Sequence, residues 1–129
     1  NYFCLDDREL RLAFHDNYGE INFLIKKLAE RVSLPGGISV TRGHLGATTF
    51  NVENCSFFEA PVLSQKIVDT TGAGDAFLAL TAPCVAKGFP MDLVAFIGNA
   101  AGALAVGFLG NKSSIETTQL FKFITALLK

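Results

Sequence analysis

Residues 69–75 read DTTGAGD, and this glycine-containing junction limits the folds open to the chain more than any other segment does. The apolar pair Ile67–Val68 before it predicts the end of a strand, and the apolar run after it predicts a helix over about Gly74–Lys87. Gly72 and Gly74 supply the unusual φ that so sharp a turn requires. Because the first amides of a helix have no partner within it and carry the positive end of its dipole, the junction predicts an anion-binding site.

An acidic residue, Asp75, lies at the start of the same predicted helix, and a carboxylate beside an anion-binding turn suits phosphoryl transfer. Gly72, Ala73 and Gly74 would supply the amides that neutralise charge developing on a phosphate. Asp75 would accept the proton of an attacking hydroxyl group. The structural alternative is an ordinary strand-to-helix turn with an acidic residue in its first turn. The segment is neither a Walker loop nor the dinucleotide-binding glycine motif, because the residues that follow it fit neither pattern.

Predicted strands alternate with predicted helices along the chain, which indicates an α/β fold with a largely parallel sheet. Pro83 predicts a kink in the helix after the glycine junction. Ser113 and Glu116 predict a capping box for the last helix. The predicted strands cover residues 2–5, 38–42, 47–51, 56–59 and 66–68, and the predicted helices cover about 7–14, 19–32, 74–87, 91–106 and 115–128.

Composition indicates one globular domain, residues 1–129. Half of the residues are hydrophobic and 18% are charged, so the chain has enough apolar surface to fold. Lysine and arginine number 11 against 12 acidic residues, and the formal net charge of −1 excludes the usual electrostatic binding of nucleic acid. Since the chain starts at Asn1 and is strongly apolar, we expect a piece of a longer protein with an exposed apolar face, which could pair with another copy as a homo-oligomer.

One uncharged stretch, Leu93–Asn111, is long enough to be weighed as a membrane segment. Gly98 and Gly102 within it have the spacing of packed membrane helices. The polar Asn99 and the several glycines of the stretch favour instead a helix buried in an α/β core. We therefore expect no membrane partner.

The three cysteines, Cys4, Cys55 and Cys84, are far apart in the sequence and form no C-x-x-C pair. His15 and His44 are not spaced to complete a metal site with them. We therefore expect reduced, mostly buried thiols in a cytoplasmic protein.

The full string DTTGAGD, followed by a small residue and Phe77, resembles the C-terminal signature of the PfkB, or ribokinase-like, family of sugar and nucleoside kinases. The resemblance extends over essentially all 129 residues but matches the C-terminal half of a typical member. It implies the C-terminal part of a ribokinase-like three-layer fold, and transfer of the γ-phosphate of MgATP to a hydroxyl group of a sugar-like substrate. In this family the N-terminal half and its lid hold the sugar. The chain would therefore be the nucleotide-binding portion, which binds ATP or ADP and is inactive as a kinase alone.

The same resemblance assigns the nucleotide contacts. Residues 40–47 are similar to the family's T-x-G-x-x-G hairpin, so Thr41, Gly43 and Gly46 would flank the nucleotide. Residues 98–103 are similar to the small-residue helix that lines the family's adenine pocket, where Asn99 takes the polar position. A plain hairpin turn and tight helix packing are the structural alternatives for these two segments.

A magnesium contact also follows from the resemblance. The family's N-x-x-E motif helps to place phosphate and Mg²⁺, and in the matching context this chain has Asp6 and Glu9. One carboxylate is enough for an ion that keeps its waters, although both residues also fit a structural helix cap. The literal motif at residues 17–20 lies between two predicted helices and reads as a cap.

Many relatives hold a monovalent cation such as K⁺ behind the anion-binding turn. The resemblance places Asp69 and the carbonyl group of Thr71 at this ion, with residues 112–114 closing over it. The structural alternative for Asp69 is a turn residue that accepts hydrogen bonds from nearby backbone amides.

Residues 4–13 and 107–112 resemble the branch of the family that contains heptose-phosphate kinases, some of them fused to a nucleotidyltransferase. The rival from another class is a non-catalytic nucleotide-binding or regulatory module that kept the fold and lost the N-terminal half. Gly-Gly and Asp sugar-binding positions upstream of Asn1 would favour the kinase.

Overall fold

The computed structural model describes residues 2–33, 36–63, 72–105 and 115–129. Its strands are β1 (Phe3–Asp6), β2 (Gly37–Thr41), β3 (Ala47–Asn51) and β4 (Ser56–Ala60). Its helices are α1 (Asp7–Phe14), α2 (Ile21–Val32), α3 (Ala73–Ala86), α4 (Met91–Ala105) and α5 (Thr117–Leu127), with a short 3₁₀ helix, η1 (Gly43–Leu45). The predicted strand at 66–68 lies outside the described residues.

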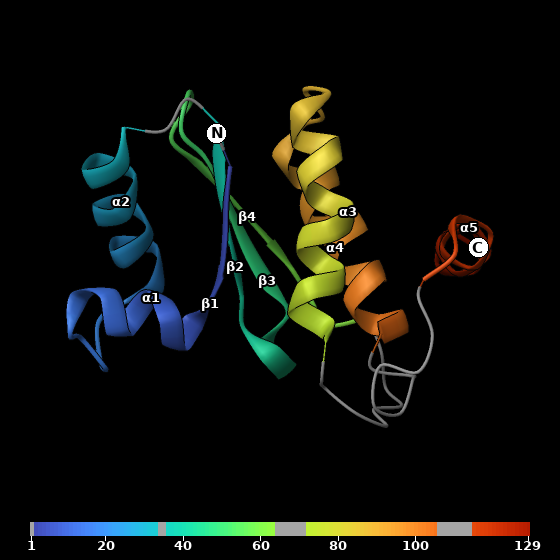
Figure 1. Cartoon of the computed structure of the whole chain (residues 1–129), viewed down its shortest axis with the longest axis horizontal. Coiled ribbons are helices and arrows are strands. Elements are labelled where there is room, and N and C mark those ends of the chain that lie inside the picture. Colours follow the sequence, from blue (N-terminus) through green and yellow to red (C-terminus); the bar gives the residue numbers. More distant parts are fainter. Residues whose placement is uncertain (1, 34–35, 64–71, 106–114) are drawn as a thin grey trace.

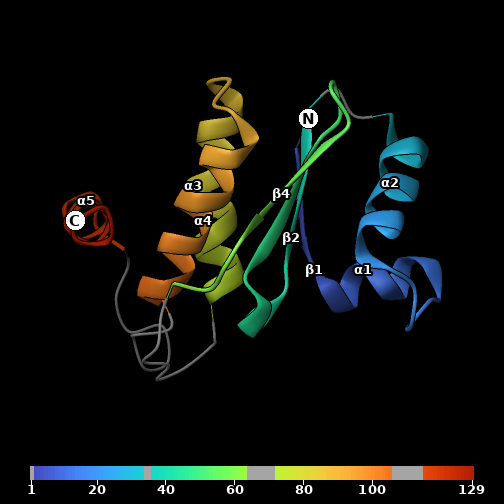
Figure 2. The same ribbon diagram turned by 180° about the vertical axis from the view of Figure 1, so that it is seen from behind.

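The elements form three layers. Among the described residues, a four-stranded sheet is in the middle, α1 and α2 lie against one face, and α3 and α4 lie against the other (Figure 1). Helix α5 lies beyond α4 on the side away from the sheet, as the view from behind also shows (Figure 2). This is the predicted three-layer α/β architecture.

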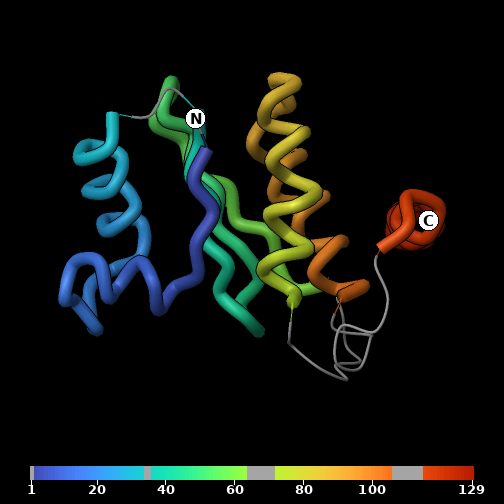
Figure 3. The backbone as a smooth tube through the Cα atoms, viewed as in Figure 1, coloured from blue at the N-terminus to red at the C-terminus, as the bar shows by residue number. Residues whose placement is uncertain are grey.

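The sheet has the order β1-β2-β3-β4. Strand β1 pairs in parallel with β2, so that Asp6 lies opposite Thr41, and β3 is antiparallel to both of its neighbours. Three strands, β1, β2 and β4, therefore run in one direction and end at the same edge of the sheet. Between β1 and β2 the chain passes through α1 and α2 on a single face (Figure 3).

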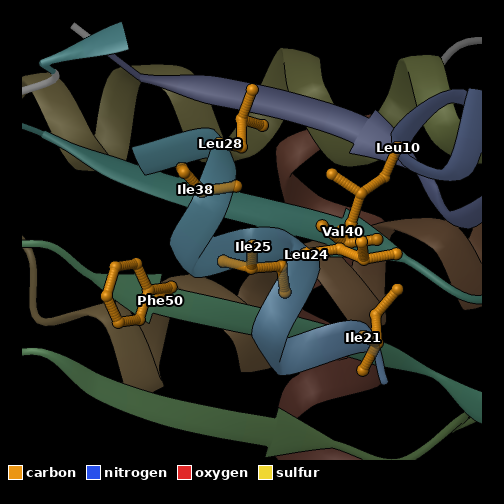
Figure 4. Close-up of a cluster of buried hydrophobic side chains, with 8 residues drawn as sticks. All are labelled: Leu10, Ile21, Leu24, Ile25, Leu28, Ile38, Val40 and Phe50. Carbon is orange, nitrogen blue, oxygen red and sulfur yellow. The ribbon is translucent and has the colours of Figure 1, made fainter. Parts of the chain in front are cut away.

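Helix α2 buries the apolar face that its periodicity predicts. Its buried side chains pack with Leu10 of α1 against the sheet (Figure 4). Full burial of an aliphatic side chain of this size stabilises a fold by about 1.5–3 kcal/mol, so this cluster fixes α1 and α2 on the sheet. Its members are Leu10, Ile21, Leu24, Ile25, Leu28, Ile38, Val40 and Phe50.

The opposite face of the sheet is covered by α4, whose small residues allow close packing. Gly98 has no room for a side chain because the ring of Phe77, from α3, occupies the space. The hydroxyl group of Thr49 in β3 donates a hydrogen bond to the carbonyl oxygen of Met91 (3.0 Å). The glycine spacing thus serves helix packing in an α/β core, and no helix in the described part of the chain is long and apolar enough to cross a membrane.

A polar network joins the start of β1 to the neighbouring layers. The hydroxyl group of Tyr2 is hydrogen-bonded to Ser39 Oγ of β2 (2.7 Å) and to Thr81 Oγ1 of α3 (3.0 Å). Thr81 Oγ1 in turn donates to the carbonyl oxygen of Phe77 (2.8 Å). Burial raises the pKa of Tyr2 to about 12 and that of the nearby Cys4 thiol to about 11.

The capping box predicted for the last helix is wrong. Helix α5 begins at Thr117, and its cap is Glu116, whose partner in the box is Gln119. Glu116 has an extended backbone and can therefore stand just outside the helix as the N-cap. The sequence pattern placed this residue inside the helix, three positions after Ser113.

Two further predictions meet different outcomes. Helix α3 continues past the exposed Pro83 to Ala86, and the kink predicted at this proline stays a prediction. The cysteines are free, as predicted, and Cys4 and Cys84 are half-buried. Cys55 is exposed, contrary to the expected burial, because it lies in the tight turn between β3 and β4 with a positive φ of 53°.

Candidate active site

A cleft of about 790 Å³ opens where β1, β2 and β4 end, and the start of α3 and the middle of α4 complete its wall. Ligands of open α/β sheets bind at this edge. Seven residues that the sequence predicts for nucleotide, phosphate or metal binding line the cleft together, although they come from distant parts of the chain. They are Asp6, Thr41, Gly43, Gly46, Ala73, Gly74 and Asn99.

The predicted hairpin forms one wall of the cleft. The amide of Arg42 donates to the carbonyl oxygen of Gly46 (2.8 Å), which closes a tight turn after Thr41. Gly46 has a φ of 86°, and a Cβ there would overlap the carbonyl oxygen of Ala60. Glycine is thus required at position 46 both for the backbone conformation and for the close approach of the end of β4.

Asn99 has a structural task in this wall. Its Nδ2 atom donates to the carbonyl oxygens of Ala60 and Pro61, each at 2.7 Å, and its side chain is nearly buried. These bonds tie α4 to the end of β4 beside Gly46. The amide nitrogen is occupied, so a nucleotide contact by Asn99 would use its Oδ1 atom.

The start of α3 forms the opposite wall. Gly72 is the N-cap with a φ of 81°, and the carbonyl oxygen of Gly72 accepts the first bond of the helix, from the amide of Ala76 (2.9 Å). The amides of Ala73 and Gly74 therefore belong to the first turn, which has no acceptors within the helix. The unusual φ predicted for Gly74 is wrong, because α3 begins before it, and a Cβ at Gly74 would meet no atom within 4 Å.

Asp75 is the third residue of α3 and is exposed, and unlike its neighbours Ala73 and Gly74 it is not among the residues that line the cleft. Its carboxylate is open to solvent one residue after the cleft-lining Gly74. Asp69 and Thr71, predicted for a monovalent cation, lie outside the described residues, as do residues 112–114. The described ranges contain no group of three or more histidine, cysteine or acidic side chains that could hold a metal ion.

Asp6 and Glu9 form a helix cap, which the sequence offered as the structural alternative to a magnesium contact. Asp6 Oδ1 accepts a hydrogen bond from the amide of Glu9 (2.7 Å), and the amide of Asp6 donates to Glu9 Oε2 (2.8 Å). Asp6 lines the cleft at the end of β1. The literal motif ends at Glu20, which caps α2 by accepting a bond from the amide of Phe23 (3.1 Å), as predicted.

Sequence reasoning missed the basic side chains of the cleft. Arg11 already has hydrogen-bond partners within the fold. Its Nε atom donates to Asp7 Oδ1 (2.6 Å), and its guanidinium also donates to the carbonyl oxygen of Gly19 (2.8 Å). Two of the four basic lining residues, Arg42 and His44, lie within the glycine turn, and this position is a sequence signal that could have identified them. The basic lining residues are Arg8, Arg11, Arg42 and His44.

The chain is similar to known proteins over most of its length. The family described as pfkB family carbohydrate kinase matches residues 1–118. The bifunctional protein HldE of Vibrio vulnificus is 35% identical over 97 residues, which cover 75% of this chain and 20% of that protein.

Two solved structures from Escherichia coli have the same fold. A putative ribokinase II in complex with ATP and Mg²⁺ has a TM-score of 0.78 and 25% identity over 96% of this chain and 39% of its own. Phosphofructokinase-2 in complex with potassium has a TM-score of 0.83 and 17% identity over 99% of this chain and 41% of its own. The chain thus spans about a fifth of the curated relative and about two fifths of the solved structures.

Proposed function

Because this chain belongs to the pfkB family of carbohydrate kinases, we propose that it is the nucleotide-binding part of an enzyme that moves the γ-phosphate of ATP to a hydroxyl group of a sugar-like substrate. The observation that carries the proposal is the single cleft that brings seven predicted residues together. The E. coli ribokinase II that shares the fold was solved with ATP and Mg²⁺, which supports a nucleotide as the ligand.

In the proposed reaction the substrate hydroxyl oxygen bonds to the γ-phosphorus, the bond from that phosphorus to the bridging oxygen of ADP breaks, and ADP leaves. Asp75 takes the proton of the hydroxyl group. The amides of Gly72, Ala73 and Gly74 stabilise the charge on the phosphoryl oxygens, because they lie at the positive end of α3. Asp75 and these amides share one helical turn, so base and anion site keep a fixed geometry.

The residues of the cleft fit Mg²⁺ bound together with ATP. This ion takes one or two carboxylates and completes its shell with waters and phosphate oxygens, so the site needs no cluster of three acidic groups. Asp6 and Glu9 would provide the carboxylates, since the cap engages Asp6 Oδ1 and Glu9 Oε2 and each group has a second oxygen. When bound, the ion would neutralise charge on the phosphates.

A monovalent cation at Asp69 and Thr71 is part of the proposal as well. Support comes from the sequence resemblance and from the potassium complex of phosphofructokinase-2, a protein with the same fold. For the substrate we propose a heptose phosphate, on the resemblance of residues 4–13 and 107–112 to that branch of the family. We place the reaction in the cytoplasm, where free thiols persist.

Nucleotide titration and a phosphotransfer assay test the proposal. Calorimetry of residues 1–129 with ATP and Mg²⁺ should detect weak binding, and the same sample should transfer no appreciable phosphate from labelled ATP to a heptose phosphate. The intact protein should transfer it. Lack of ATP binding at millimolar concentration would contradict the nucleotide assignment, and intact protein that binds ATP without transferring phosphate would point to a regulatory module.

A further inference from the structure

Arg42 is a cleft residue whose buried Nε atom has no hydrogen-bond partner among the described residues. It follows Thr41, the last residue of β2, and precedes η1, so its backbone is held by the tight turn to Gly46. We propose that its guanidinium group binds the phosphate tail of the nucleotide and selects charged nucleotides over uncharged nucleosides. This inference rests on the proposed function. It adds a phosphate-binding side chain, which neither the glycine motifs nor the start of α3 provides.

The first observation is an unsatisfied donor. The Nε atom of Arg42 is buried and has no hydrogen-bond acceptor in the described part of the chain, and its side chain makes no ion pair there. A buried guanidinium donor without an acceptor is costly, since hydrogen bonds to charged groups are among the stronger ones in proteins. The described part of the fold therefore holds Arg42 at the cleft and leaves its Nε donor without an acceptor.

The second observation is that nearby carboxylates are already engaged. Asp6 Oδ1 accepts the amide of Glu9 (2.7 Å), and Asp7 Oδ1 accepts Arg11 Nε (2.6 Å). Both aspartates line the same cleft as Arg42, yet neither pairs with it. Within the described residues, Arg42 is thus available to a bound acceptor in the cleft.

The third observation is what Arg42 shares the cleft with. The amides at Ala73 and Gly74, at the start of α3, form the opposite wall. An anion in the cleft would meet the helix start on one side and a planar guanidinium on the other, and guanidinium groups bind phosphate oxygens in pairs. The ligand class with several adjacent phosphate oxygens is a nucleoside di- or triphosphate.

The test is calorimetry of the chain with ATP, ADP and adenosine as three separate probes. Arg42→Gln should weaken ATP and ADP binding by about 10- to 100-fold, the usual range for loss of a hydrogen bond between charged groups. Adenosine binding should stay within twofold of the wild type. The ATP affinity of Arg42→Lys should lie between those of the wild type and Arg42→Gln, because an ammonium group keeps the charge and loses the paired geometry.

Arg31→Gln is the matched control, since the Arg31 guanidinium lies over the ring of Phe14, 5.0 Å from its centre, away from the cleft. It should bind all three probes as the wild type does. ATP affinity of Arg42→Gln within twofold of the wild type would overturn the inference. Equal weakening of ATP and adenosine would also overturn it, because Arg42 would then act through the fold. A wild-type chain that binds no ATP would instead overturn the proposed function, and this inference with it.

Discussion

The ring of Phe77 fills the space that a side chain at Gly98 would need. Phe77 belongs to α3 shortly after the candidate base, and Gly98 belongs to α4 directly before Asn99. Phe77 is also part of the cleft wall and is almost fully buried. This contact therefore sets how closely α3 approaches α4, the helix that carries Asn99, and it links core packing to the shape of the cleft.

Gly98→Ala should lower the free energy of unfolding by about 1–3 kcal/mol, because the added methyl group overpacks the contact with Phe77. Urea unfolding measures the change. Gly102→Ala on the same helix is the control, since its Cβ would lie at an ordinary 3.8 Å from the carbonyl oxygen of Ala73. That variant should be as stable as the wild type or slightly more so. Equal losses in both variants would contradict the packing account.

Asp75→Asn in the intact protein should lower kcat by about 10²- to 10⁴-fold, because the amide cannot take the proton of the substrate hydroxyl group. ATP affinity should change little, since the change removes a negative charge and keeps the shape of the side chain. Steady-state kinetics and ATP titration check both parts. The control is Asp92→Asn, an acidic residue in the first turn of α4. A kcat of Asp75→Asn within threefold of the wild type would refute the base assignment.

Substitutions at the two glycines of the junction should have different effects. Gly72→Ala should destabilise the fold by about 1–2 kcal/mol, because an L-residue is strained at a φ of 81°. Gly74→Val should unfold near the wild-type temperature yet bind ATP more weakly, since its methyl groups would enter the open space where a phosphate would lie. Thermal melts and ATP titrations of both variants separate the effects. ATP binding of wild-type strength in Gly74→Val would show that the phosphate lies elsewhere.

Asn99→Leu should cost about 1–3 kcal/mol of stability, because the carbonyl oxygens of Ala60 and Pro61 lose their shared donor. Asn99→Asp is the informative companion. An ionised carboxylate would face the same two carbonyl oxygens, so this variant should be less stable at pH 7 than at pH 4 relative to the wild type. Urea unfolding at the two pH values measures the difference. A pH-independent difference would mean that position 99 is not held against these carbonyl oxygens.

Alkaline pH should destabilise the fold through Tyr2 and Cys4. Burial raises their pKa values from 10.0 to about 12 and from 9.0 to about 11. The unfolded chain therefore loses these protons first, and the stabilisation present below pH 9 is lost as the pH rises from about 9 to 12. Urea midpoints at pH 8 and pH 10.5 should show the fall. The double variant Tyr2→Phe/Cys4→Ala should show a smaller fall, and an unchanged fall would contradict the assignment.

Local signals predicted the elements closest to the site well. Helix α1 has the predicted bounds because its cap, Asp6 with Glu9, lies entirely within a few residues. Strand β3 also has the predicted bounds, since a glycine turn and an asparagine at its end delimit it. The junction at Gly72 was recognisable for the same reason, although the start of α3 one residue earlier moved the need for a positive φ away from Gly74.

Long-range contacts could not be predicted from the sequence. Asn99 reaches carbonyl groups 38 and 39 residues earlier in the chain, and no local pattern encodes that pairing. The Nε atom of Arg42 is buried without an acceptor among the described residues, which no local sequence pattern shows. The contact between Phe77 and Gly98 could be recognised only once the relative placement of α3 and α4 was known. The spacing of small residues alone fits packing in a membrane as well as packing in a protein core.

The order of the strands in the sheet repeats their order in the chain, and this bears on how the protein folds. Short turns join β2 to β3 and β3 to β4, whereas two helices separate β1 from β2. Closing a short loop costs less entropy than closing a long one, and distant pairings slow folding. We expect the three antiparallel strands to form first and β1 to join last. Asp6 then reaches its place beside Thr41 late, so a refolding chain should regain its sheet before it regains a complete cleft.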